Sequence, residues 1–223
     1  MQTLQNLELL EIEILELLNS IRVLESLYFG GGTMLRLCHN LNRYSTDLDF
    51  WLDTSADSKQ IYKSIRNSLS ENYKLTDSMN KRNILLFEFK SPSVNRSLKI
   101  EIRKEQTNFD WEYKIAFSRF ATKQVMVRAL TLSQMMKNKF DALLSRKIIR
   151  DAFDIEFLLM RGIELPNDKE KLQAALLIIN NFKERDFKVT LGSILDDNER
   201  IFYLENRFKL LKEEIVKKLN LLK

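Results

Sequence analysis

Apolar residues near the start of the chain recur at helical spacing. Residues 2–27 place leucine and isoleucine at alternating steps of three and four, which predicts one amphipathic helix packed on the core. Residues 34–41 predict a short apolar helix, and residues 56–72 predict another with apolar residues at four-residue steps. The first part of the chain is therefore expected to carry helices, but not only helices.

Alternation of apolar and polar positions predicts strands in the same part of the chain. This period of two appears at residues 47–52, 73–79, 83–90 and 97–103, and the third of these is rich in isoleucine, leucine and phenylalanine. Residues 109–130 predict a strand or two joined by a loop. The aromatic residues of this last stretch alternate with charge and are expected to pack in the core rather than stack on nucleic-acid bases; they are Phe109, Trp111, Tyr113 and Phe117.

Helical spacing returns at Thr131 and continues to the end of the chain. The predicted helices are residues 131–146, 150–161, 168–181 and 198–221. We therefore expect an α+β protein, with a mixed sheet and helices followed by an all-helical C-terminal half. The corresponding domains are residues 1–130, including the N-terminal helix, and residues 131–223.

Composition narrows the class of protein. The chain has 223 residues, 44% of them apolar, with 5 glycines and 2 prolines, which is typical of a helix-rich globular protein. Cys38 is the only cysteine, so an intramolecular disulfide is excluded and a cysteine-based zinc site is not expected. The N-terminus has no signal-peptide pattern, and the longest apolar run is too short to span a membrane. We expect a cytoplasmic protein with no membrane partner.

Two acidic positions share one face of the strand predicted at residues 47–52. Asp47 and Asp49 are two residues apart, so their carboxylates point the same way and repel unless a cation lies between them. Such hard oxygen ligands suit Mg²⁺ or Mn²⁺. Glu101 is central in another alternating strand and is expected to lie beside them and complete a two-metal site.

A glycine-rich turn precedes this strand. Gly31 and Gly32 allow a tight turn and a close approach to a ligand, and a helix beginning at Thr33 would offer free backbone N–H groups to a phosphate. The Thr33 hydroxyl would cap that helix or contact the phosphate itself. A phosphate cradle beside a carboxylate pair is suited to phosphoryl or nucleotidyl transfer from a nucleoside triphosphate.

These motifs resemble those of a known superfamily. Gly32-Thr33 is followed by thirteen residues and then Asp47-Leu-Asp-Phe50, which is similar to the signature of polymerase-beta-like nucleotidyltransferases. The fuller form adds Arg43-x-Ser45 before Asp47 and resembles the AbiEii/MenT-like toxin group.

A second block strengthens the resemblance. The group's C-terminal helical motif is similar to Lys139-x-x-Ala-Leu, Arg146 and Arg150-Asp-x-x-Asp154 of this chain. On one continuous helix, Lys139, Arg146, Arg150 and Asp154 would share a face and would need an anionic partner opposite. A triphosphate, RNA, or acids within the fold, including Asp151 and Asp154, would each serve.

The resemblance implies roles for these residues. Asp47, Asp49 and Glu101 would bind the metal, and Lys139 would neutralise charge on the phosphates in the transition state. Phosphate oxygens would be bound by Gly31, Gly32, Thr33 and Ser45, with Arg43 close by. Asp151 and Asp154 would orient the base or ribose, or fix Lys139 and Arg150.

Charge bears on the acceptor. Residues 59–104 hold eleven bases against four acids, and residues 114–161 hold ten against four, so positive charge flanks the acidic motif. The resemblance implies a toxin of a toxin-antitoxin pair, with a cognate antitoxin as partner, that adds a nucleotide to the 3′ end of an RNA such as tRNA. Nucleotidylation of a protein and a non-catalytic module that binds RNA or an antitoxin stay open. A small cationic acceptor, as for aminoglycoside-type enzymes, fits basic flanks poorly.

Overall fold

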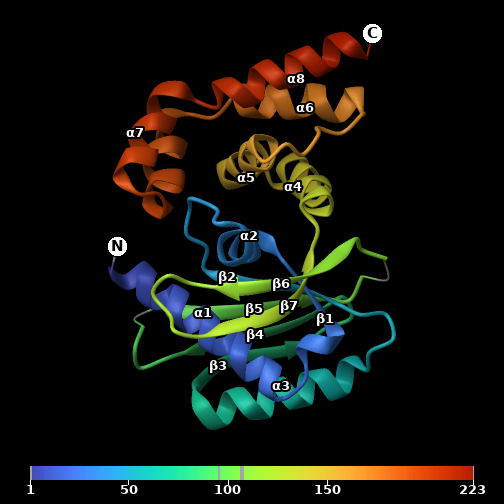
Figure 1. The fold of residues 1–223 in the computed structure, drawn as a ribbon, viewed down its shortest axis with the longest axis vertical. Coiled ribbons are helices and arrows are strands. Elements are labelled where there is room, and N and C mark those ends of the chain that lie inside the picture. The colour runs from blue at the N-terminus through green and yellow to red at the C-terminus, as the bar shows by residue number, and fades with distance from the viewer. Residues whose placement is uncertain (1, 95, 106–107, 223) are drawn as a thin grey trace. The chain divides into compact units, whose positions relative to one another are not determined.

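The computed structural model describes residues 2–94, 96–105 and 108–222. The chain forms two compact units (Figure 1). The first, here the sheet unit, contains the residues up to 40 together with 44–130. The second, the helical unit, contains residues 131–223 and the short segment Leu41–Arg43, which the chain passes through between two elements of the sheet unit.

The sheet unit is built on one mixed sheet of seven strands. Its strands are β1 (Leu27–Gly30), β2 (Asp47–Leu52), β3 (Lys74–Asn80), β4 (Ile84–Lys90), β5 (Ser97–Arg103), β6 (Trp111–Phe117) and β7 (Gln124–Leu130). Their order across the sheet is β3-β4-β5-β2-β1-β7-β6. The β1·β7 and β2·β5 pairs are parallel and the other pairs are antiparallel. The helices of this unit are α1 (Gln2–Ser20), α2 (Gly31–His39) and α3 (Ser58–Asn72).

The two faces of the sheet differ in chemistry because successive side chains alternate between them. The back face is apolar and buried; its residues include Phe29, Leu48, Phe50, Phe87, Ile100 and Val127. Helix α3 packs on this face, where the Tyr62 ring stacks on Phe87 at a centroid distance of 5.3 Å. The front face carries Asp47, Asp49 and Glu101, all of them half-buried. The candidate chemistry therefore lies on the face that the apolar core does not use.

The predicted N-terminal helix is too long. Helix α1 ends at Ser20, and a short 3-10 turn, Leu24–Ser26, leads into β1. Apolar spacing continues through residue 27, but Arg22 has a left-handed φ of 57° that ends the helix. Strand β1 escaped prediction because its partners, β2 and β7, come from later parts of the chain.

The helical unit contains five α-helices within the described residues. They are α4 (Leu132–Arg146), α5 (Ile149–Met160), α6 (Lys169–Asn180), α7 (Asp197–Asn206) and α8 (Lys209–Leu221). Residues 186–191 form a π-helical turn and residues 192–194 a 3-10 turn, and neither was predicted. The helix predicted at 198–221 is wrong in its continuity, because Arg207 and Phe208 have left-handed φ values of 46° and 58°.

Residues 139–154 do not form one helix either. Helix α4 ends with Lys147 at its C-cap, where φ is 56°, and α5 begins at Ile149. The two helices predicted at residues 131–146 and 150–161 are therefore confirmed, and the face that residues 139–154 would share on one continuous helix is not formed. Among the described residues, no helix is long and apolar enough to cross a membrane.

Candidate functional site

The three predicted metal ligands lie on two neighbouring strands, as expected. Strands β2 and β5 pair in parallel, with Asp49 directly opposite Glu101 and Asp47 opposite Lys99. Paired residues point to the same face of a sheet. The strand register thus places three carboxylates on the front face, two of them side by side.

The Asp49 carboxylate is held against the turn that follows β1. Gly30 pairs with Asp49, and the next residue, Gly31, has a φ of +74°. A Cβ atom on Gly31 would lie 2.2 Å from Oδ2 of Asp49. Residue 31 must therefore be glycine for two reasons: its backbone is left-handed, and the Asp49 carboxylate occupies the space that a Cβ atom would need.

Helix α2 begins earlier than predicted. Its first residue is Gly31, with Gly30 as N-cap, and not Thr33. The Thr33 hydroxyl does not cap the helix but donates a 2.6 Å hydrogen bond to the carbonyl of Asp47, and Thr33 is fully buried. The hydroxyl thereby ties the start of α2 to the start of β2. The first backbone N–H groups of α2 still belong to the Gly31-Gly32-Thr33 segment that was expected to bind phosphate.

Lys99 joins the site although the sequence reasoning assigned it no role. Its ammonium forms an ion pair with the Glu101 carboxylate. Burial alone would lower the pKa of Lys99, but the hydrogen bond to Glu101 and the charges of Glu101, Asp47 and Asp49 raise it. Its position two residues before Glu101 on one strand was the available signal, since residues i and i+2 share a face.

The three carboxylates are chemically suitable ligands for a divalent cation, but their side chains are not grouped to hold one in this structure. Among the described residues, no three His, Cys, Asp or Glu side chains are grouped so as to hold a metal ion. Glu101 instead faces Lys99, which partly compensates the negative charge. The donor set, three carboxylates on one face of adjacent strands, is nevertheless the kind that Mg²⁺ and Mn²⁺ prefer.

A second cluster lies within the helical unit and centres on Asp154. Arg43 donates two hydrogen bonds to its carboxylate, from Nε at 2.6 Å and from Nη2 at 2.7 Å. The Nζ of Lys139 lies 2.6 Å from Oδ2 of the same carboxylate. Burial alone would raise the pKa of Asp154, but Arg43 and Lys139 hold it below its usual value. All three residues are buried, so this is a desolvated ion cluster.

Asp151 extends this cluster toward the surface. Arg146 donates to both of its carboxylate oxygens, at 2.7 and 3.2 Å. The Nζ of Lys139 is 3.7 Å from Asp151. Of the anionic partners that the sequence left open, Arg146 therefore has an acid within the fold, Asp151. Arg150 differs, because it is half-buried and forms no ion pair among the described residues.

The segment between α2 and β2 joins the two clusters along the chain. Arg43 belongs to the helical unit, where it forms an isolated β-bridge with Leu195, and Asn42 donates a hydrogen bond to Glu199. Ser45 is half-buried and lies between Arg43 and Asp47, at which β2 begins. The predicted site residues thus form two groups, one in each unit, and Tyr44 alone separates Arg43 of the helical unit from Ser45 of the sheet unit along the chain.

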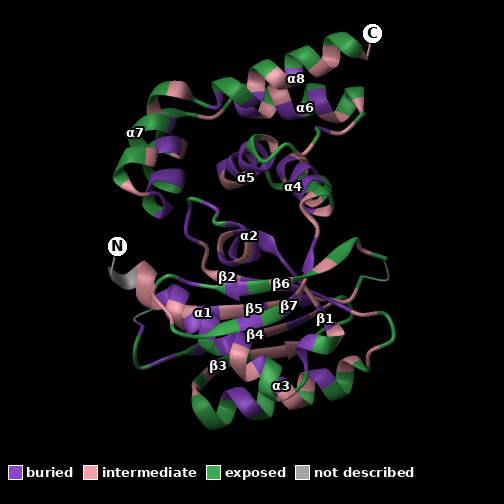
Figure 2. Ribbon diagram, viewed as in Figure 1, coloured by how far each residue is buried: buried purple, intermediate pink, exposed green. Residues whose placement is uncertain are grey.

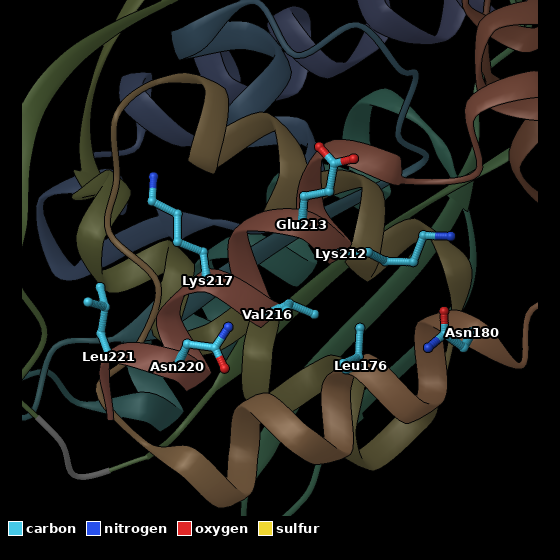
Figure 3. A pocket seen from close by; sticks show the side chains of 8 residues that line it. All are labelled: Leu176, Asn180, Lys212, Glu213, Val216, Lys217, Asn220 and Leu221. Atoms are coloured by element: carbon cyan, nitrogen blue, oxygen red, sulfur yellow. The ribbon is translucent and has the colours of Figure 1, made fainter. Parts of the chain in front are cut away.

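A pocket of about 650 Å³ lies elsewhere in the helical unit, between α6 and α8 (Figure 3). Its lining includes Leu176, Val216 and Leu221, with Lys212 and Lys217 at its rim. None of the predicted site residues lines it, and it brings no carboxylate pair together. It therefore contributes nothing to the chemistry described above.

Fold and site together define a nucleotidyltransferase. The mixed sheet, the glycine turn at the start of a helix, and paired carboxylates on adjacent strands are its parts. A family profile described as the nucleotidyl transferase AbiEii toxin of type IV toxin-antitoxin systems matches residues 19–221. The chain belongs to this AbiEii family, an EC 2.7.7-type class of enzyme whose description implies a nucleoside triphosphate substrate and an antitoxin partner.

Solved structures show the same fold at low sequence identity. JHP933 from Helicobacter pylori is 18% identical, with a TM-score of 0.53 over 98% of this chain and 96% of that one. A predicted nucleotidyltransferase from Helicobacter pylori is 18% identical, with a TM-score of 0.55 over 96% and 97%. No curated protein matches the sequence. The predicted fold class is confirmed by the sheet, the helices and these neighbours.

Proposed function

We propose that the protein transfers a nucleotide from a nucleoside triphosphate to the 3′ end of an RNA such as tRNA, and that this metal-dependent reaction is its action as a toxin. The observation that carries the proposal is the pairing of Asp49 with Glu101 on adjacent strands, with Asp47 on the same face. The family supplies the reaction class. The basic stretches around the acidic motif favour a polyanionic acceptor over a cationic one.

Asp47, Asp49 and Glu101 would hold Mg²⁺ or Mn²⁺. A cation bound there supplies Lewis acidity toward the phosphates and lowers the pKa of the acceptor hydroxyl. For Glu101 to act as a ligand, its carboxylate exchanges Lys99 for the cation, which replaces one positive partner by another. Lys99 would then be available to a phosphate oxygen nearby.

The glycine turn would bind the triphosphate. Backbone N–H groups of Gly31 and Gly32, at the start of α2, would donate to phosphate oxygens, helped by the helix dipole. Thr33 would act by fixing the turn to β2, since its hydroxyl is bonded to the Asp47 carbonyl. The Ser45 hydroxyl would supply a further donor.

The helical unit would supply positive charge. Lys139 would neutralise the phosphates in the transition state, with Arg43 and Arg150 as further cations. The contacts within the cluster favour Asp154 and Asp151 as residues that hold Lys139, Arg43 and Arg146 in position.

The test is transfer of label from each α-³²P nucleoside triphosphate to total bacterial RNA in the presence of Mg²⁺. The wild type is compared with Asp49→Asn, which keeps the shape of the side chain but removes its charge. Asp77→Asn is the matched control, because Asp77 is an exposed carboxylate on β3, a strand at the sheet edge. We expect label in the tRNA band for the wild type and the control, and none for Asp49→Asn.

Two outcomes would contradict the proposal. If Asp49→Asn keeps even about a tenth of the activity, Asp49 does not belong to the machinery, because loss of a metal ligand costs far more than tenfold. If folded wild type labels no RNA with any triphosphate but labels protein when a bacterial lysate replaces the RNA, the acceptor is a protein. If it labels neither, a binding role replaces the enzymatic one.

A further inference from the structure

An aromatic and basic row crosses the front face of the sheet beside the carboxylates. Glu101, Asp49 and Gly30 lie in register across β5, β2 and β1. Two residues further along the strands, and so on the same face, Arg103 lies opposite Trp51, and Trp51 lies opposite Tyr28. Phe29 pairs with Ala129, so the residues just before them, Tyr28 and Arg128, also share the front face.

Strand β6 completes this row at the edge of the sheet. Tyr113 pairs with Arg128, and Trp111 pairs with Leu130. We name the aromatic–arginine row by its six members, Arg103, Trp51, Tyr28, Arg128, Trp111 and Tyr113. All of them lie on the face of the sheet that carries the carboxylates (Figure 1 shows the strands).

Cation–π and ring contacts hold the row together. The Arg103 guanidinium lies 5.0 Å from the Trp51 ring, and that of Arg128 lies 4.1 Å from Tyr28 and 4.3 Å from Trp111. The Trp111 and Tyr113 rings meet edge to face at 5.2 Å. Arg128 is fixed further by hydrogen bonds to the Tyr28 hydroxyl and to Asp53. Rings and guanidinium planes therefore stand in defined positions before any ligand arrives.

The end of the row on β6 is open to solvent. Tyr113 is 65% exposed and Trp111 36% exposed, against the expectation from the sequence that both pack in the core. Phe117 is also exposed, at 38%, and only Phe109 is half-buried, against Trp51 and Tyr28. Figure 2 shows exposed positions along β6. Large rings left in water on a folded sheet indicate a binding surface.

The charge around these rings suits a polyanion. Residues 111–130, which form β6, β7 and their connection, hold four bases and one acid. Flat rings beside arginine on an open strand are the arrangement that binds unpaired nucleotides, because every base offers a π-face and every linkage a phosphate.

We propose that the aromatic–arginine row binds the single-stranded 3′ segment of the acceptor RNA, with bases stacked on Tyr113 and Trp111 and a phosphate on Arg103. This inference rests on the proposed RNA acceptor. Trp111 is three strands away from Asp49, or ~14 Å at ~4.8 Å per strand. About four stacked nucleotides at ~3.4 Å each cover that distance. The reacting 3′ hydroxyl then lies at the carboxylates while the preceding bases occupy β6.

The test is direct binding of a fluorescent single-stranded RNA of about 12 nucleotides, within the range that one single-strand-binding module covers. Anisotropy is measured with the full-length protein, without nucleotide or metal. Tyr113→Ala is expected to weaken binding roughly 5- to 150-fold, the range for loss of one stacked base, and Tyr113→Phe is expected to bind like the wild type. Ile115→Ala and Met126→Ala are matched controls, because both side chains are exposed beyond the row on the same face.

Several outcomes would overturn the inference. One is unchanged RNA binding by Tyr113→Ala. Another is an equal loss in Ile115→Ala or Met126→Ala, which would mean that apolar area and not stacking binds the ligand. A third is a wild-type dimer in sedimentation that Ile115→Ala dissociates, which would place a second copy of the chain on this face.

The failures of the two proposals are distinguishable. Asp49→Asn should abolish transfer while leaving RNA binding intact. In the transfer assay, Tyr113→Ala should raise KM for RNA and leave KM for the nucleotide unchanged. If the wild type transfers nothing to RNA but Tyr113→Ala still weakens RNA binding, the row is an RNA-binding surface and the proposal that RNA accepts the nucleotide is wrong. If transfer to RNA occurs and Tyr113→Ala changes neither binding nor KM, the row falls alone.

Discussion

Replacement of Gly31 by alanine tests the link between the glycine turn and the Asp49 carboxylate. The residue has a φ of +74°, which costs an L-residue about 1–2 kcal/mol. The new methyl group would also lie 2.2 Å from Oδ2 of Asp49, so the carboxylate must move. Such overpacking costs about 1–3 kcal/mol more. We expect the free energy of unfolding to fall by about 2–5 kcal/mol in total.

The effect on function should exceed the effect on stability. Displacement of a catalytic group by about 1 Å can lower a rate ~100-fold. Nucleotide transfer is therefore expected to fall at least about 100-fold at a temperature where the variant remains folded. The assays are urea unfolding followed by circular dichroism, and α-³²P transfer, on the same preparation.

Gly162 provides the matched control. Its φ is +80°, but nothing lies within 4 Å of where its Cβ would be. Gly162→Ala should therefore lose only the backbone cost of about 1–2 kcal/mol and keep its activity. In the Asp49→Ala background, which lacks the carboxylate but keeps a Cβ atom 2.8 Å from the new methyl group, Gly31→Ala should cost less than in the wild type but still more than Gly162→Ala. Full activity in Gly31→Ala, or equal stability losses for the two glycines in the wild-type background, would refute the reasoning.

Two buried carboxylates give predictions of opposite sign. Asp154→Asn leaves Arg43 and Lys139 buried without their shared counter-charge, so the free energy of unfolding should fall by about 3–5 kcal/mol, while Asp141→Asn, an exposed control, should change it by less than about 1 kcal/mol. Because the pKa of Asp154 is lowered on folding, the charged carboxylate contributes to the free energy of unfolding above the unfolded pKa of about 3.9. The difference in the free energy of unfolding between wild type and Asp154→Asn, measured by urea titration, should therefore close as pH falls below that value. A difference that stays constant to low pH would contradict the ion cluster. Glu11 is buried, its Oε1 has no hydrogen-bond partner, and burial, then the charge of Glu8, raises its pKa well above the ordinary value. Because the pKa of Glu11 is raised on folding, its carboxyl group costs the folded state stability as pH rises above about 4.3. At neutral pH, Glu11→Gln should therefore have a free energy of unfolding about 1–3 kcal/mol higher than the wild type. This difference should vanish near pH ~4. Glu13→Gln, on the exposed side of the same helix, should show no such pH dependence, and an equal gain there would remove burial as the cause.

Much of the secondary structure could be predicted because it depends on local periodicity. The strand at residues 47–52 was predicted to the residue, and β3, β4, β5 and α3 within two residues at either end. The errors occur where local pattern and backbone conformation disagree. Arg22, Lys147, Arg207 and Phe208 adopt left-handed conformations that no apolar spacing reveals, and each ends or interrupts a helix. These residues carry side chains, so the glycine signal that usually marks such a position is missing.

The sequence by itself predicted which face of the sheet carries the acidic residues and which family the chain resembles. The spacing of Asp47 and Asp49 places both on one face of a strand, and the alternating strand around Glu101 predicted a third carboxylate for the same face. The glycines predicted a turn, and the two motif blocks resembled the family to which the profile match assigns the chain. The Asp47–Asp49 pair and the glycine turn could be inferred because their residues are close together in the chain, where covalent geometry fixes the relation, whereas the place of Glu101 beside Asp49 depends on the pairing of two distant strands.

Only the tertiary structure decided which partners those residues have. Glu101 against Asp49, Asp49 against Gly31, and Arg43 with Lys139 on Asp154 join segments up to 111 residues apart, and their pairing follows from strand register and helix packing. The exposure of Tyr113 and Trp111 is also a tertiary property. An aromatic residue on an alternating strand packs in the core or faces solvent according to which side of the sheet the helices cover, and the helices here cover the other one.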